Sequence, residues 1–429
     1  MQTMTSHAVK NIISYLPIVG LLCVVGCMPF YYGPLQRWSL YIALGLYIID
    51  YIINKRWQNI GWNRQKWVYV AFIVFFVCFP IRQLFDPYYS DQFTSVLEHN
   101  LPFLVFGIIG LIGVTDKMRI EPFAWVMWAM SCVIALYLAV QTVSLHTENW
   151  EEWILAYNQQ RIAFINTHMV VNMYWNLTVV LCVYTLMHRH YPLWVRICMG
   201  IGLLFIAAGL LISEGRTGLL TFLGVLSMFI IYYAICNKKW VLLPVFLIFA
   251  LCSLIGLKQR DRFAKPEICE NPRLYIWSVT LDMIGERPIT GYGVCSARKE
   301  FVERGLNDTD FYEHYATGYI LEEQGIGHSD PDLNRMHPHN AFLETWIQLG
   351  IVGVLVLVLC MLLPLTMHLD KRQLYIDLCL FVFFMQMLFE NFGTQLNALY
   401  LCTMILVIHF HCDKSAAVPC NTDDTDANR

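Results

Sequence analysis

The feature that most constrains the fold of this chain is a series of twelve apolar stretches, most of them close to 20 residues long. A helix of about 20 residues crosses the hydrocarbon core of a bilayer, and a helix satisfies its own backbone hydrogen bonds there. The stretches run near 11–30, 34–53, 67–85, 101–114, 123–145, 170–187, 197–213, 218–236, 240–257, 341–366, 373–390 and 397–411. The composition agrees, because only 14% of the residues are charged, against about 25% in soluble domains. We therefore expect an all-α, polytopic membrane protein with about 12 transmembrane helices.

The short connections predict the orientation of these helices. Cytoplasmic loops of membrane proteins carry an excess of Lys and Arg, and here basic residues follow every second apolar stretch. Examples are Lys55, Arg56, Lys117, Arg119, Lys238 and Lys239. Both termini are therefore expected in the cytoplasm, with the lipid bilayer around the helices. The total of 29 Lys+Arg against 32 Asp+Glu gives no indication of nucleic acid as a partner.

One connection is much longer than the others. Residues 258–338 form an outward segment rich in charged and aromatic residues, and connections of such length are usually functional. We expect it to fold with short helices. The predicted organisation is nine transmembrane helices in residues 1–257, this large loop at 258–338, helices ten to twelve in 339–412, and a polar cytoplasmic tail at 413–429.

Ionisable residues are scarce at the centres of the apolar stretches. Asp50, Asp377 and Glu390 lie towards their ends, where polar groups are expected to reach the membrane surface. A coupled transporter should carry buried acids or histidines along a pathway. Their scarcity makes a transporter the less favoured class without excluding it.

A first candidate motif lies in the short outward turn before the stretch 218–236. Arg216 stands within the sequence Ser213 to Leu220, and a helix N-terminus offers free N–H groups and a positive dipole end. An arginine there predicts a phosphate or pyrophosphate site. The alternatives are a membrane-surface anchor or an ion pair with Glu214.

A second motif begins within the long loop. Arg273 and Trp277 are four residues apart and would share one face of a helix. A tight turn is predicted at Pro288 to Gly293, where Gly291 and Gly293 allow close approach of the backbone to a partner. Structural packing of the tryptophan, with an exposed arginine, is the simpler interpretation of this motif.

A third motif closes the loop, at His337-Pro338-His339-Asn340. A histidine at a membrane surface can take up a proton near neutral pH. Asn340 is suited to cap the following helix, and Glu344 lies where it could orient the imidazole. Polar residues without catalytic function at a membrane surface are the alternative.

Together the three motifs resemble those of the bacterial O-antigen ligase and polymerase superfamily, whose members transfer lipid-linked glycans. Residues 216–220 resemble its Arg-x-x-x-Leu element, and residues 273–293 resemble the opening of its large periplasmic loop. Residues 339–350 resemble the ligase signature His-Asn-x(9)-Gly. The resemblance extends over roughly residues 160–395 and is closest to the ligases.

The resemblance implies a GT-C-like, inverting glycosyltransferase of the bacterial inner membrane that needs no metal and no cofactor. An undecaprenyl-pyrophosphate-linked glycan would be the donor, and a hydroxyl, foremost that of lipid A–core, would be the acceptor. His339, Arg216 and Arg273 would be catalytic. Residues expected to contact the substrates are Arg161, Arg82, Arg287, Asn340, Glu344 and His337. An O-antigen polymerase or a protein O-oligosaccharyltransferase remains the alternative within the superfamily.

Two further features of the loop leave alternatives open. The Asp-x-Asp pairs at 308–310 and 330–332 are of the kind that holds a divalent cation in many glycosyltransferases, and Asp332 with the histidines of the third motif could suggest zinc. An oxidising compartment around the loop would permit a disulfide between Cys269 and Cys295, and the sequence leaves open whether it forms.

Overall fold

The long elements of the computed structural model are all α-helices, which confirms the expected all-α membrane protein. The structure describes residues 2–30, 33–59, 61–113, 117–144, 168–188, 191–213, 216–241, 272–307, 337–366, 373–389 and 403–408, with the single residues 115, 244 and 247. Its α-helices are α1 (Gln2–Ile13), α2 (Leu16–Cys27), α3 (Gly33–Ile53), α4 (Lys66–Gln83), α5 (Gln92–Ile112), α6 (Glu121–Ser144), α9 (His168–His188), α10 (Leu193–Ile212), α11 (Arg216–Cys236), α14 (Pro272–Glu286), α15 (Val294–Asn307), α18 (Ala341–Thr366) and α19 (Gln373–Phe389).

Eight of the described segments are long and apolar enough to cross a membrane. They are Ala8–Cys27, Lys66–Gln83, Phe93–Ile112, Glu121–Val140, Met169–Met187, Leu193–Ile212, Thr217–Cys236 and Ala341–Thr366. Helices α3 and α19 occupy two more of the predicted stretches, although neither is among these eight. The predicted stretches 240–257 and 397–411 lie mostly outside the described residues, so the total of about twelve stays a prediction.

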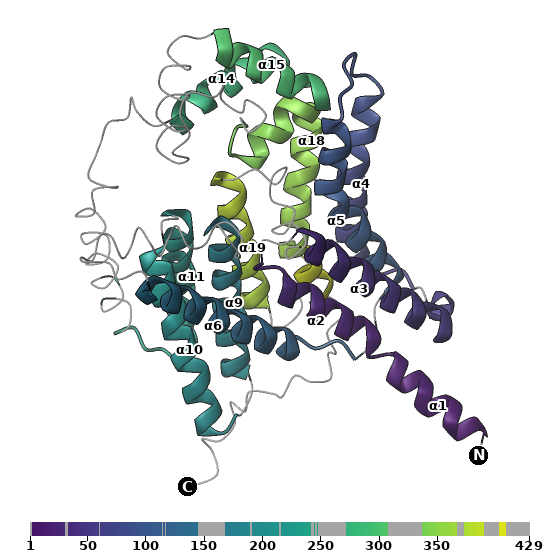
Figure 1. The fold of residues 1–429 in the computed structure, drawn as a ribbon, viewed down its shortest axis with the longest axis vertical. Coiled ribbons are helices and arrows are strands. Elements are labelled where there is room, and N and C mark those ends of the chain that lie inside the picture. The colour runs from purple at the N-terminus through teal and green to yellow at the C-terminus, as the bar shows by residue number, and fades with distance from the viewer. Residues whose placement is uncertain are drawn as a thin grey trace.

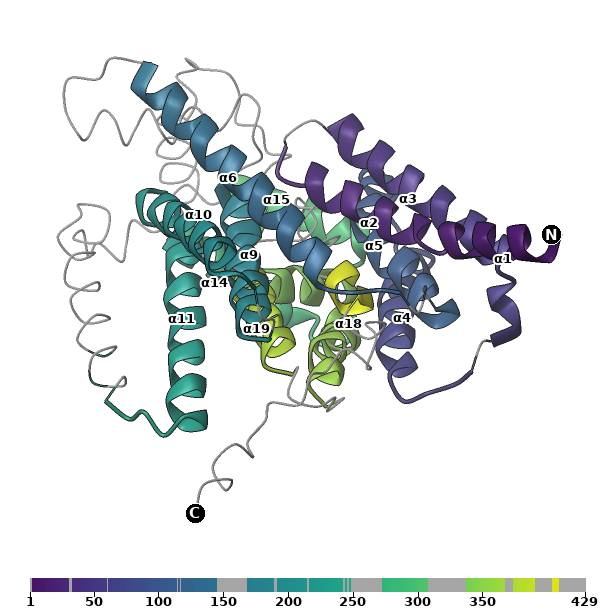
Figure 2. The same ribbon diagram turned by 90° about the horizontal axis from the view of Figure 1, so that it is seen from below.

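Helix α9 lies at the centre of the bundle. Both views show it among α6, α10, α11 and α19 (Figures 1 and 2), and it contacts each of them. In its candidate span 83% of the residues are buried, against 33–44% in the other seven. Trp175 and Tyr174 on this helix are fully buried. A polar side chain on α9 is therefore held among other helices and away from lipid.

Helices α14 and α15 lie together at one end of the molecule, above the start of α18 (Figure 1). They form a small apolar core of their own with the first turns of α18, to which Phe301 and Ile347 contribute buried side chains. The two helices are short and lie within the segment 258–338. They therefore cover the end of the bundle at which α18 begins and α4 ends.

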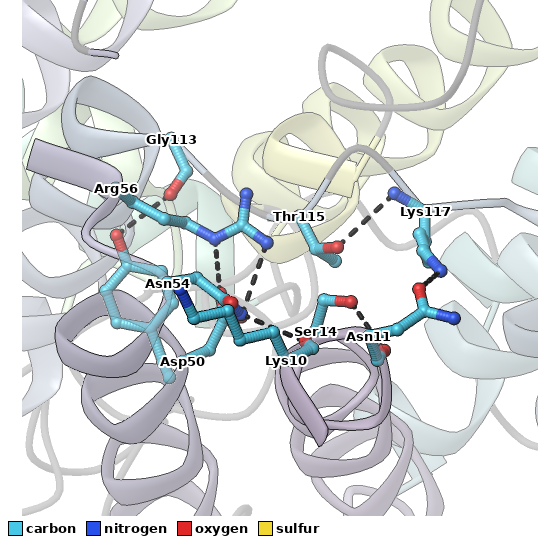
Figure 3. Close-up of polar contacts among 10 residues, drawn as sticks. Lys10, Asn11, Ser14, Asp50, Asn54, Arg56, Gly113, Thr115 and Lys117 are labelled. Atoms are coloured by element: carbon cyan, nitrogen blue, oxygen red, sulfur yellow. Dashed lines mark hydrogen bonds and ion pairs between the residues drawn. The ribbon is translucent and has the colours of Figure 1, made fainter. Parts of the chain in front are cut away.

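A polar cluster joins the end of α3 to α1 and to the connection after α5 (Figure 3). Asp50 is fully buried there, and Arg56 Nε lies 2.5 Å from its carboxylate. Asn54 donates hydrogen bonds to Asp50 and to the Lys10 carbonyl. Asp50 is therefore paired within the protein, where Arg56 balances its charge, and its depth relative to the membrane surface stays a prediction.

Candidate active site at the end of the bundle

The turn predicted at Pro288–Gly293 packs against an interruption in α18. Gly350 has φ 70° and ψ −168° within that helix, so the backbone on either side of it is free to bond elsewhere. The Tyr292 N–H donates to the Ile347 carbonyl at 2.7 Å, and the Ile351 N–H donates to the Pro288 carbonyl at 3.1 Å. The second and third sequence motifs are thus joined directly to each other.

This close approach depends on glycine at several positions. A Cβ atom on Gly350 would lie 2.6 Å from the carbonyl carbon of Ile289, and one on Gly291 would lie 2.7 Å from the Gly350 nitrogen. Gly291 also has a φ of 62°, where a side chain is strained whatever the space. The glycine that ends the ligase-type signature therefore has a structural function, which is to receive the turn.

Arg82, at the end of α4, holds the same turn from the other side. Its Nε donates to the Thr290 carbonyl at 2.9 Å and its Nη2 to the Gly291 carbonyl at 3.3 Å. Its guanidinium thus bonds to the backbone of the turn, and the substrate contact that the resemblance implies for Arg82 stays a prediction.

Asp86 caps the N-terminus of α15. Its carboxylate accepts hydrogen bonds from the backbone N–H groups of Cys295 at 3.0 Å and Ser296 at 3.1 Å, and from the Ser296 hydroxyl. Burial alone would raise the pKa of Asp86, but the hydrogen bonds from Ser296, Tyr88 and Cys295 outweigh it and the pKa is lowered. Gly293 makes room for this carboxylate, because a Cβ there would overlap it.

A charged network fixes the outer side of the turn. Arg304 donates two hydrogen bonds to Glu286, at 2.8 and 2.7 Å, and the Tyr292 hydroxyl donates to the same carboxylate at 2.5 Å. The bonds from Arg304 and then Tyr292 lower the pKa of Glu286 to about 2. Burial, followed by the bond to Glu286, raises the pKa of Tyr292 to about 12. Arg287, another expected substrate contact, lies 4.5 Å above the Tyr292 ring.

His339 lies where the loop enters α18, in a constrained backbone conformation. Its φ is 49°, a value that costs a residue other than glycine about 1–3 kcal/mol and that is concentrated at functional sites. Its backbone N–H donates to Nδ1 of His337 at 3.2 Å, and the centroids of the two imidazole rings are 3.9 Å apart. The indole of Trp277 on α14 donates to the Pro338 carbonyl at 2.9 Å, which fixes the residue just before His339.

Asn340 fixes the other side of His339. Its side-chain oxygen accepts hydrogen bonds from the N–H groups of residues 342–343, both at 3.0 Å, and this confirms the expected helix cap. Its Nδ2 also donates to the Leu388 carbonyl at the end of α19. Glu344 accepts a hydrogen bond from Gln348 at 2.6 Å. The bond to Leu388 ties the start of α18 to α19 next to the histidine, and the other bonds lie within α18.

The two predicted catalytic arginines are placed by their helices. Arg216 is the first residue of α11, and Arg273 is the second residue of α14, one turn before Trp277. Helix α11 contacts α19, to which Asn340 is bonded. The side chains of both arginines lie outside what the structure describes, and so does the whole of Arg161.

The metal and disulfide alternatives concern residues of the long loop. The segments 308–310 and 330–332 and Cys269 lie outside the described residues, so both alternatives stay predictions. Where the chain is described, it holds no group of three His, Cys, Asp or Glu residues suited to a metal. The Cys295 thiol is buried and points to the Ser90 carbonyl at 3.9 Å.

Sequence reasoning missed two asparagines on α9 that belong to this region. Asn172 and Asn176 are buried and bond to residues on either side of Arg216, namely Ser213 and Gly218. Two amides one turn apart in an apolar stretch are costly inside a membrane. This spacing was the signal that could have revealed them.

Residues 201–358 match the family model described as O-antigen ligase. Over these residues the chain is similar to the O-antigen ligases. The O-antigen ligase segment contains all three motifs, including Arg216, Arg273 and His339, and this confirms the resemblance found in the sequence. Arg82 and Asp86, which hold its turn and its helix α15, come from outside it.

A curated relative agrees over a shorter stretch. A protein of Rickettsia conorii, whose name describes it as a candidate polysaccharide ligase, is 33% identical over 89 residues. The aligned stretch covers 21% of this chain and 18% of the relative.

Proposed function

We propose that the chain transfers a glycan from undecaprenyl pyrophosphate to an acceptor hydroxyl, foremost that of lipid A–core. The reaction takes place at the periplasmic face of the bacterial inner membrane, with both termini of the chain in the cytoplasm. It proceeds with inversion and uses neither metal nor cofactor. The O-antigen ligase match and the direct hydrogen bonds between its second and third motifs support this proposal.

His339 accepts the proton of the acceptor hydroxyl as its oxygen attacks the first sugar carbon. The bond between that carbon and the pyrophosphate oxygen breaks, and undecaprenyl pyrophosphate leaves with the bonding electron pair. Arg216 and Arg273 bind the pyrophosphate and stabilise the charge that develops on it, because guanidinium groups match phosphate oxygens in pairs. Arginines then supply the positive charge that a metal supplies in other glycosyltransferases.

The observation that carries the proposal is the direct junction of the second and third motifs. Trp277 donates to the residue before His339, and the Pro288–Gly293 turn bonds to α18 on both sides of Gly350. The junction places the helix that carries Arg273 beside the strained histidine. These contacts join the backbone of the proposed base to the helix of a proposed phosphate-binding arginine, and a transfer from a lipid pyrophosphate needs such groups to be held in position.

The experiment uses the purified full-length chain in liposomes with an undecaprenyl-pyrophosphate glycan. Three acceptors are supplied in parallel: lipid A–core, a second lipid-linked repeat unit, and a Ser/Thr acceptor peptide. Product on lipid A–core supports the ligase, product on the repeat unit a polymerase, and product on the peptide an oligosaccharyltransferase. No product with any acceptor would overturn the proposal.

Variants and a chelator test the assigned chemistry. His339→Ala and Arg216→Ala should abolish the product, whereas His99→Gln on α5 should retain it. Full activity of both alanine variants would refute the site. EDTA should have no effect, and loss of activity in EDTA would instead support the Asp-x-Asp pairs as a metal site.

A further inference from the structure

Helix α9 carries two buried amides where an apolar helix would need none. Asn172 is 2% exposed and Asn176 is 1% exposed. They lie one turn apart near the start of the most buried helix of the bundle. Buried amides in a membrane protein must be held by hydrogen bonds from their neighbours, and the partners of these two amides indicate their purpose.

Asn172 bonds to the end of α10. Its Nδ2 and the Ser213 Oγ are 2.9 Å apart, and the Ser213 hydroxyl and the Asn172 Oδ1 are 3.0 Å apart. Ser213 is the residue at which α10 ends, with an extended backbone. Asn172 therefore fixes the point at which the chain leaves α10.

Asn176 bonds to the start of α11. Its Nδ2 donates to the Gly218 carbonyl at 3.0 Å and to the Asn172 carbonyl at 2.8 Å. A Cβ on Gly218 would lie 2.6 Å from the Asn172 side chain, so the absence of a side chain lets α11 approach α9 closely. The two asparagines thus hold the chain at Ser213, three residues before Arg216, and at Gly218, two residues after it.

Packing of α9 against α11 does not by itself require these amides. Within the part of the chain that the structure describes, the Asn176 Oδ1 has no hydrogen-bond partner, and a buried acceptor left in that state destabilises a protein. An apolar side chain would join the helices without this cost. The benefit of the amide therefore comes from its donor, which bonds to the first turn of α11.

We propose that Asn172 and Asn176 are positioning residues for Arg216, which set the place from which its guanidinium reaches the pyrophosphate of the lipid-linked donor. The inference rests on the proposed function and goes beyond it by assigning this task to α9. It means that affinity for the donor depends on α9, which bonds to the chain on both sides of Arg216.

The test compares variants that remove these bonds with a matched control on the same helix. Asn176→Leu removes the hydrogen bond to the Gly218 carbonyl, and Ser213→Ala removes the bonds between Ser213 and Asn172. Both substitutions change the side-chain volume little, and we call them the anchor variants. Thr178→Val is the control, because Thr178 is also buried on α9 and bonds to Ser131 on α6, away from α11. Each variant is assayed in liposomes for thermal unfolding, for the KM of donor and acceptor, and for inhibition by undecaprenyl pyrophosphate.

We expect both anchor variants to raise the donor KM and the inhibition constant of undecaprenyl pyrophosphate about tenfold, with an unchanged KM for the acceptor. Thr178→Val should lower thermal stability alone. The tenfold effect should vanish when Asn176→Leu is combined with Arg216→Lys, because residues that act through one another are not additive.

Three outcomes would overturn the inference. The first is that the folded anchor variants keep the wild-type donor KM. The second is that Thr178→Val changes the donor KM as much as they do. The third is that the effects of Asn176→Leu and Arg216→Lys on the donor KM are fully additive. If Asn176→Leu fails to fold, Ser213→Ala alone decides the question, since it deletes only a hydroxyl. A wild-type protein that forms no product refutes the proposed function instead, so the two failures are distinguishable.

Discussion

Replacing Gly350 with alanine should disconnect the Pro288–Gly293 turn from α18. With φ at 70°, a residue other than glycine adds about 2 kcal/mol of backbone strain. The new Cβ would also lie 2.6 Å from the Ile289 carbonyl carbon, so the turn must move. Moving it breaks three hydrogen bonds, from the N–H groups of Tyr292 and Ile351 and from the Trp346 indole, at about 1 kcal/mol each. We expect a total destabilisation of about 5 kcal/mol for this junction.

The measurement is thermal unfolding of the purified protein together with glycan transfer by the folded fraction. Gly285→Ala is the matched control, because Gly285 lies within α14 and a Cβ there meets no atom within 4 Å. It should stabilise the protein by about 0.5–1 kcal/mol, as alanine does in place of glycine in a helix. If Gly350→Ala unfolds at the wild-type temperature and transfers glycan normally, the junction does not depend on this glycine and the reasoning is wrong.

Three further substitutions test individual contacts. Asp86→Asn should destabilise α15 by about 1 kcal/mol, because both oxygens of the Asp86 carboxylate accept hydrogen bonds and an uncharged amide keeps only one acceptor oxygen. Asp91→Asn should not, because Asp91 makes no cap bond to α5. The folded-state pKa of Asp86 is lowered. The carboxylate therefore contributes its full stabilisation above the unfolded pKa of about 3.9, and this stabilisation is lost as the pH falls through the folded-state pKa. When unfolding is followed from pH 6 downwards, the stabilities of the wild type and of Asp86→Asn should converge. Arg82→Met should lower stability and turnover without raising the donor KM, and a raised donor KM would restore its predicted contact with substrate. Trp277→Phe should reduce turnover about fivefold, equivalent to about 1 kcal/mol for one hydrogen bond, and unchanged turnover would show that the Pro338 carbonyl needs no donor.

The helices were predictable because each apolar stretch is close to the thickness of a bilayer. Where polar residues continue a helix beyond the membrane, length and hydropathy fail. Helix α5 illustrates this, since it begins at Gln92 and not near 101. There the Asn100 side chain donates to the Val96 carbonyl one turn earlier, so polar residues extend the helix without apolar periodicity.

The motifs of the candidate site were predictable as residue types, but their contacts were not. The cap at Asn340 followed from local chemistry, because its partners are only two and three residues away. Arg82 and Asp86 bond to residues more than 200 positions later in the chain, and no local pattern indicates such a pairing. The contacts that Arg82 and Asp86 make within the protein became visible only in the folded structure.

The cap that Asp86 places on α15 has a consequence for how the family segment folds. The matched residues 201–358 contain α15 but not the carboxylate on which it begins, nor Arg82, which holds the adjacent turn. Both groups come from the end of α4 and the residues just after it, so this part of the chain supports the turn and α15 from outside the matched residues. The stretch that matches the family model is therefore smaller than the structural unit around it, because residues 201–358 alone would lack the Asp86 cap and the Arg82 contacts.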